Sequence, residues 1–251
     1  MSVTLQDQPP EAQDEWVRVR RRKGRGKTAQ HRPEPSKESS APEPSISHLT
    51  LEQVKKDYEH FAGQWTSSPA SHRLRDALSK KKYNVRIDKA ICFGIGTFDP
   101  ADASWDIKRK AHVQLAAFLL IVEHVQLSLN EPITCYFQDP IFNSVDKDFI
   151  DSLGHKVVAS PQGFHLVDES SLVFGVHLYR EIYSQVIAKH TPAMFVGTPY
   201  RVWEDFHGAD NLNWDRMKHL DKQCSHINFP ENPSETTFSS TAIHWVDKDN
   251  N

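Results

Sequence analysis

KAICFGIGTFDP, residues 89–100, joins an apolar run to two glycines that are separated by one residue. The run has the composition of a buried strand. A glycine turn directly after the first strand of an α/β sheet lets the backbone approach a ligand. The strict dinucleotide fingerprint would need a third glycine at Asp99, and a methyltransferase-like glycine motif would need one at Phe98. The stretch therefore predicts a strand and a tight turn at the ligand end of a sheet, without identifying the ligand.

Apolar strand-like runs and amphipathic helical segments alternate on both sides of this stretch. Thr50-x-x-Gln53 predicts a capping box that opens one helix, and Pro69 predicts the start of a second. We expect strands over 90–94, 133–137, 156–160, 171–176 and 193–197, and helices over 107–126, 146–153 and 180–190. Such alternation indicates βαβ units. We predict one Rossmann-like, doubly wound α/β domain over 48–251, with a mostly parallel sheet, helices on both faces and a βαβ core from about residue 89.

Residues 1–47 have a different composition. They hold the basic block Arg18–Lys27, followed by a segment rich in Pro, Ser and Glu. Because this segment has few apolar side chains to bury, we expect a disordered tail. The basic block is typical of a nuclear-import or RNA-contacting patch, and equally of a solvated tail that aids solubility.

The composition of the 251 residues limits the kind of protein. A net charge of −3 argues against affinity of the whole chain for nucleic acid. The three cysteines form no C-x-x-C pair, and no signal-peptide pattern opens the chain. The longest apolar run, Val113–Val122, is about half of the ~20 residues that a membrane span needs. We expect a cytoplasmic and nuclear protein that contacts no membrane and meets nucleic acid, if at all, through Arg18–Lys27.

The candidate ligand site lies at the ends of the first two expected strands. Gly94, Gly96 and Thr97 follow the first strand, and Asp139 follows the second. A carboxylate in the position of Asp139 accepts hydrogen bonds from ribose hydroxyls in related sheets. Adenosylmethionine or a nucleotide is then the natural ligand, whereas Asp99 disfavours NAD and FAD because it would repel a pyrophosphate. The alternative is that Asp139-Pro140 only ends the strand and fixes a turn.

Two further residues are candidates for catalysis. His177 follows another expected strand, and Tyr183 could reach the same crevice. His177 is suited to act as acid, base or axial haem ligand, or it is a packed, hydrogen-bonded side chain. The remaining histidines, among them His207, His226 and His244, show no metal-binding spacing, so we expect no metal site. The sequence has no G-x-S-x-G motif and no P-loop.

The order of several motifs resembles that of the SRR1-like family, named for sensitivity to red light reduced. The segment Ser160–Phe174, SPQGFHLVDESSLVF, is similar to fungal-type members. The other motifs that carry the resemblance are Phe93–Phe98, Gln114-Leu115, Asp139–Phe142, Leu153-Gly154, His177 with Tyr183, Thr241–Trp245 and Trp16 with its Arg/Gly block.

The resemblance implies a regulatory protein with protein partners. Members are linked to circadian-clock input, light signalling and, in some lineages, haem metabolism, and no settled reaction comes with the family. Trp203, Phe206 and Trp214 lie in a polar segment. They form either a surface that binds a partner or buried anchors of a long connection. The first hypothesis is thus a regulatory scaffold without catalysis. The second is a transferase that uses adenosylmethionine or a nucleotide at the Gly94–Gly96 turn.

Overall fold

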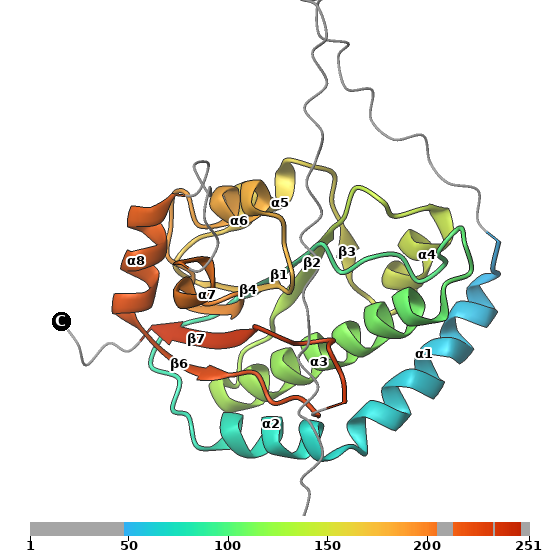
Figure 1. Cartoon of the computed structure of the whole chain (residues 1–251), viewed down its shortest axis with the longest axis horizontal. Helices are drawn as coiled ribbons and strands as arrows, with labels where there is room; N and C mark the ends of the chain where they lie inside the picture. Colours follow the sequence, from blue (N-terminus) through green and yellow to red (C-terminus); the bar gives the residue numbers. More distant parts are fainter. Residues whose placement is uncertain (1–47, 205–212, 233, 247–251) are drawn as a thin grey trace, which may run out of the picture. The chain divides into compact units, whose positions relative to one another are not determined.

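The computed structural model describes residues 48–204, 213–232 and 234–246. In these residues β1 (Lys89–Phe93) lies inside a seven-stranded sheet with the order β3-β2-β1-β4-β5-β7-β6 (Figure 1). The first five strands of this order run parallel, and β7 is antiparallel to both of its neighbours. The other strands are β2 (Thr134–Gln138), β3 (Lys156–Val157), β4 (Ser171–Gly175), β5 (Met194–Gly197), β6 (Cys224–Asn228) and β7 (Ala242–Val246).

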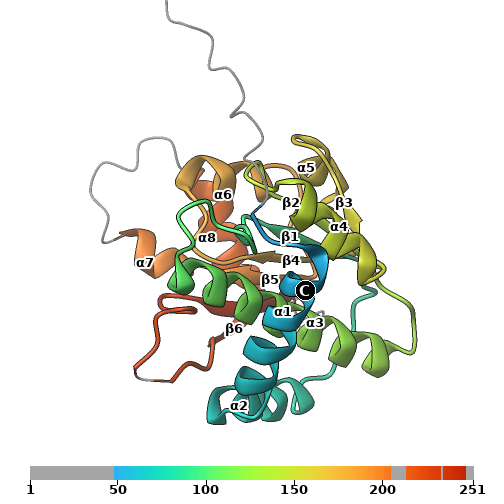
Figure 2. The same ribbon diagram turned by 90° about the vertical axis from the view of Figure 1, so that its right-hand side faces the viewer.

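Helices cover both faces of the sheet. Figure 2 shows α1, α2 and α3 together on one side of the strands and α5 and α6 on the other. The helices of the first side are α1 (Leu51–Thr66), α2 (Pro69–Ser79), α3 (Trp105–Leu129) and α4 (Ser144–Ser152). Those of the second side are α5 (Gln162–Leu166), α6 (Arg180–Val186), α7 (Tyr200–Glu204) and α8 (Trp214–Gln223).

Successive side chains of β1 point to opposite faces of the sheet, and the core accordingly has two layers. Ala90 and Cys92 pack with the α1–α4 side, while Ile91 and Phe93 pack with the α5–α8 side. All four side chains are at most 1 % exposed. Burying one such large apolar side chain contributes about 1.5–3 kcal/mol. An apolar strand with no polar face is therefore stable only when helices cover it on both sides.

Helix α3 passes, by length and composition, for a membrane span. Its side chains Ala117, Phe118 and Ile121 are fully buried in the core between the sheet and the other helices. The apolar composition of α3 is therefore explained by its place in the core of this domain.

The predicted helix ends are confirmed in local detail. The Thr50 hydroxyl accepts from Gln53 N at 3.3 Å, and the Gln53 side chain accepts from Thr50 N at 2.8 Å. This reciprocal pair satisfies two N–H groups at the start of α1. Pro69 opens α2, as predicted. Gly154 has a φ of +82°, which glycine adopts readily just beyond the end of α4.

The α/β class and the mostly parallel sheet are confirmed. The sequence did not predict β6 and β7, nor the helices α5, α7 and α8. β7 (AIHWV) is mostly apolar and its first three residues are buried. β6 (CSHIN) is the edge strand of the sheet, and most of its residues are polar and exposed. The expected tail over 1–47 lies outside the described residues, and the boundary at residue 48 stays a prediction.

Candidate functional site

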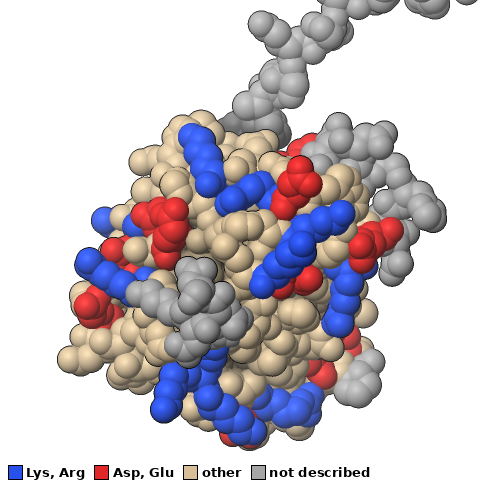
Figure 3. Space-filling model, turned by 90° about the vertical axis from the view of Figure 1, so that its left-hand side faces the viewer, with Lys and Arg blue, Asp and Glu red and all other residues tan. Residues whose placement is uncertain are grey.

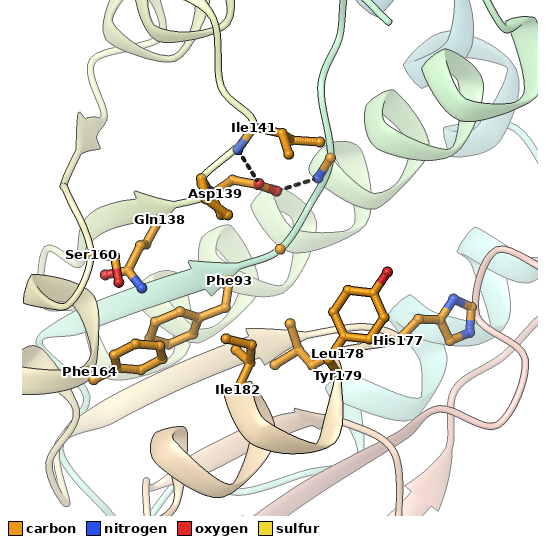
Figure 4. A pocket seen from close by; sticks show the side chains of 13 residues that line it. Phe93, Gln138, Asp139, Ile141, Ser160, Phe164, His177, Leu178, Tyr179 and Ile182 are labelled. Atoms are coloured by element: carbon orange, nitrogen blue, oxygen red, sulfur yellow. Dashed lines mark hydrogen bonds between the residues drawn. The ribbon is translucent and has the colours of Figure 1, made fainter. Parts of the chain in front are cut away.

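A pocket of about 340 Å³ lies at the carboxyl ends of β1, β2 and β4 (Figure 4). This is the edge at which parallel α/β sheets bind ligands. Its volume is at the lower end of the range for small-molecule sites. The residues around it are Phe93, Gly94, Gly96, Gln138, Asp139, Pro140, Ile141, Ser160, Phe164, His177, Leu178, Tyr179 and Ile182.

The two glycines give the turn after β1 its shape. Gly94 and Gly96 have φ values of +62° and +88°, in the left-handed region that disfavours other residues. A Cβ on Gly94 would lie 2.7 Å from Cδ2 of Leu178, so a side chain there would also displace one wall of the pocket. The glycines let the backbone itself line the pocket.

Asp139 is the acidic group of the pocket, and its carboxylate holds two loops together. One oxygen accepts from Gly96 N at 2.8 Å and the other from Ile141 N at 3.1 Å, as the dashed lines of Figure 4 show. Burial raises the pKa of the carboxyl, and the two backbone hydrogen bonds oppose that rise. Each oxygen keeps the capacity to accept a further hydrogen bond.

Thr97 follows the turn but does not line the pocket. Its hydroxyl donates to Asp146 at 2.8 Å, and the backbone N of Phe98 donates to the same carboxylate at 2.8 Å. Asp146 is fully buried and also accepts from Asn143 N at 3.0 Å. We missed Asp146 as an organiser of the turn. Its sequence signal was the Asn143-x-x-Asp146 capping box at the start of α4.

His177 and Tyr183 do not meet in the pocket. His177 lines it, but the imidazole points away from Asp139 in Figure 4, and its Nε2 lies 2.8 Å from the carbonyl oxygen of Ser239. Tyr183 is 1 % exposed, and its hydroxyl donates to the carbonyl of Thr198 at 3.0 Å. Burial raises the pKa of Tyr183 far above its usual range. The expectation that Tyr183 reaches the crevice is wrong. Tyr183 lies on the side of α6 that faces the sheet, and its ring packs against Phe195 of β5.

The aromatic walls of the pocket were not predicted. Phe164 of α5 stacks on Phe93 with ring centroids 5.1 Å apart and an angle of 8° between planes. Tyr179 is 82 % exposed, and in Figure 4 its ring and that of Phe164 stand at opposite sides of the pocket. No local sequence signal pointed to these residues, because both follow from the packing of α5 and α6.

The charges around the pocket are informative about its ligand. None of the described residues that line it is Lys or Arg, and Asp139 is its only carboxylate. The N-terminus of α3 is also absent from this set, since residues 97–104 separate the glycine turn from the helix. The part of the pocket that the structure describes thus lacks the positive groups that hold a polyphosphate. It suits a ligand that is neutral or positively charged near Asp139.

The aromatic segment beyond β5 is partly buried. Trp203 is 9 % exposed and packs against Tyr183, with ring centroids 5.7 Å apart. Trp214 is half-buried and contacts Tyr200 edge-on. Phe206, the third residue of the expected partner surface, lies outside the described residues. Of the two alternatives for this segment, a partner surface or buried anchors, Trp203 fits the second, because it is buried.

Comparisons with known proteins identify a family. A family model described as the SRR1 domain matches residues 71–245. A search of curated proteins gave no match. One similar solved structure is a chain from a complex between the Haloferax volcanii Trm112 methyltransferase activator and a protein assigned as a methyltransferase. It has 8 % identity, a TM-score of 0.34 and an alignment over 77 % of this chain and 97 % of that one. A likeness at this level carries no argument about activity.

Proposed function

The chain belongs to the SRR1 domain family, and we propose that it is a regulatory protein whose pocket binds adenosylmethionine. The observation that carries the proposal is the pocket beside the Gly94–Gly96 turn, where the described lining residues include one carboxylate and no lysine or arginine. Circadian, light-signalling or haem-related regulation is the role that the family resemblance implies.

Three groups of adenosylmethionine have possible counterparts in the pocket. Its ribose hydroxyls can donate to Asp139, which stands just beyond the end of β2. Its adenine ring can pack against the aromatic walls made by Phe164 and Tyr179. Its sulfonium is a cation, so a nearby carboxylate is favourable. ATP or NAD would instead bring phosphates next to Asp139, where the described lining residues offer no lysine or arginine to pair them.

The strand order gives a second, weaker argument. The sheet has one strand, β7, that runs opposite to the others and lies between β5 and the edge strand β6. Many adenosylmethionine-dependent methyltransferases use this arrangement. This is an analogy of fold, and a fold alone does not establish an activity. It favours methyl transfer as the alternative to a purely regulatory role for the bound ligand.

Ligand binding is tested by thermal shift and calorimetry on the full chain. Adenosylmethionine at 100 times its Kd is expected to stabilise the fold by about 2.7 kcal/mol, which raises Tm by about 5–10 °C. ATP, NAD and haem are expected to give no comparable shift. Tyr179→Ala and Asp139→Asn are expected to weaken binding about tenfold or more. Leu127→Ala is the matched control, because Leu127 is also an exposed apolar residue, at 73 %, but does not line the pocket.

Two results would contradict the ligand assignment. One is a shift with ATP, NAD or haem in place of adenosylmethionine, and the other is no shift with any of the four. Formation of S-adenosylhomocysteine from adenosylmethionine in cell extract by the chain, but not by Asp139→Asn, would support the transferase alternative.

We also propose that Arg18–Lys27 directs the chain to the nucleus and that its partners there are proteins. The motivation is the run of arginines and lysines in an otherwise polar segment. A fluorescent fusion of the full chain is expected in both cytoplasm and nucleus, and one that lacks residues 1–47 is expected mainly in the cytoplasm. Equal distribution of the two fusions would remove the targeting role.

A further inference from the structure

Three side chains that can bind metals lie close together at the β6 edge of the sheet. His226 of β6 and His244 of β7 are direct partners in the antiparallel register, with ring centroids 5.4 Å apart. Asp221 comes from the last turn of α8, just before β6. One ligand atom from each of the three side chains lies within 4.8 Å of the others. None of the three lines the pocket at β1, so this cluster is a separate feature.

His244 is the buried member of the cluster, and one of its nitrogens is unaccounted for. The side chain is fully buried, and Nδ1 lies 3.2 Å from the backbone carbonyl oxygen of Phe195. Because a carbonyl only accepts, Nδ1 carries the proton and Nε2 keeps its lone pair. Nε2 has no hydrogen-bond partner among the described residues. A buried acceptor without a partner costs free energy.

The environment of His244 resembles that of a metal-ligating histidine, because the ring is buried and its Nδ1 is bound to a backbone carbonyl. A neutral imidazole whose other N–H binds a backbone carbonyl is the arrangement found for histidines that ligate metals. The carbonyl of Phe195 fixes the tautomer and the orientation of the ring.

We propose that Asp221, His226 and His244 form a zinc site between α8 and the β6–β7 pair. Two imidazoles and one carboxylate suit zinc. Zinc–nitrogen distances of about 2.0–2.1 Å require the ligand atoms to approach one another more closely than they do here. His226 is exposed and Asp221 is half-buried, so a zinc site requires these two side chains to move toward the buried His244. Three protein ligands leave a fourth position for water or a substrate group.

The expectation of no metal site rested on local spacing. His226 and His244 are separated by a long connection, and only the register of two strands brings them together.

Figure 3 shows the side of the molecule on which α8 lies in Figure 1, where basic and acidic side chains are interspersed. This mixed surface gives no general attraction for cations, so tight zinc binding there depends on the three ligands.

The site is tested by titrating zinc chloride into the full chain after removal of metals with a chelator. Calorimetry is expected to show one zinc per chain. Cobalt(II), used as a probe, is expected to give the intense visible absorption bands of a four-coordinate site. His226→Gln and Asp221→Asn are expected to weaken zinc binding at least tenfold. Neither residue is fully buried, so both variants are expected to fold.

His219→Gln is the matched control, because His219 is an exposed histidine on the same helix as Asp221 and lies outside the cluster. Its zinc affinity is expected to equal that of the unmodified chain. Zinc affinity that is unchanged in His226→Gln, or binding that stays weak and non-stoichiometric, would overturn the proposal and assign the binding to surface histidines alone.

Discussion

Asp146→Ala is expected to lower the free energy of unfolding by about 3 kcal/mol, the largest loss that we expect from a single polar substitution in this domain. Asp146 is fully buried at the start of α4. Its carboxylate accepts three hydrogen bonds, from the Thr97 hydroxyl and from the backbone N of Phe98 and Asn143. Alanine would leave these buried donors without a partner.

The same substitution is expected to weaken the ligand pocket. Thr97 and Phe98 directly follow Gly96, whose own N–H is held by Asp139. Once the Asp146 contacts are lost, the turn after β1 is anchored on one side only. We therefore expect Asp146→Ala to reduce the stabilisation by adenosylmethionine as well as the stability of the free protein, in chemical denaturation with and without ligand.

Asp148→Ala is the control for this prediction. Asp148 lies on the same helix, but its side chain is exposed. Its replacement is expected to change stability by no more than about 0.5 kcal/mol. Asp146→Asn should fall between the two, because its amide keeps one acceptor oxygen. An Asp146→Ala protein as stable as Asp148→Ala would show that the buried carboxylate contributes nothing net.

The sequence predicted the elements that have strong local signals. The apolar run of β1, the capping box at Thr50 and the proline at the start of α2 each depend on a few adjacent residues, and the structure contains all three. β6 was not predicted because an exposed edge strand such as CSHIN has no apolar period. Its place in the sheet depends on pairing with β7.

The candidate site was predictable only where strand ends supply it. Gly94, Gly96, Asp139 and His177 surround one pocket because parallel strands end at the same edge, and their roles in binding stay predictions. Tyr183 was misplaced because a strand-end argument ignores which side of the next helix faces the core. Helices α5 and α6 supply the aromatic walls, and their packing is a tertiary feature that no short motif carries.

The pH dependence of stability is expected to reveal His112, a fully buried histidine on α3. Its ring lies among Phe61, Phe98 and Phe149, with the nearest centroids 5.0 Å away. Neither ring nitrogen has a hydrogen-bond partner among the described residues. Burial lowers the pKa of His112 to about 4; the negative charge of Asp57 opposes this shift and the positive charge of Lys108 adds to it.

A lowered pKa means that the unfolded chain binds a proton that the folded protein excludes. The contribution of His112 is therefore fully present above its ordinary pKa of about 6.5 and is lost as the pH falls toward 4. Between pH 7.5 and pH 5 we expect it to lower the free energy of unfolding by about 2 kcal/mol. Urea unfolding at several pH values measures this slope.

His112→Phe removes the titrating group but keeps an aromatic ring in the same cluster. The variant is expected to be at least as stable at pH 7.5 and to lose about 2 kcal/mol less than the unmodified protein at pH 5. His244, whose pKa is also lowered to about 4, is present in both proteins, so their difference isolates His112. Phe61→Leu, which changes the packing around His112 without a titrating group, should shift stability equally at all pH values. Parallel curves for His112→Phe and the unmodified protein would mean that His112 is protonated or hydrated within the fold, and that the aromatic cluster admits water.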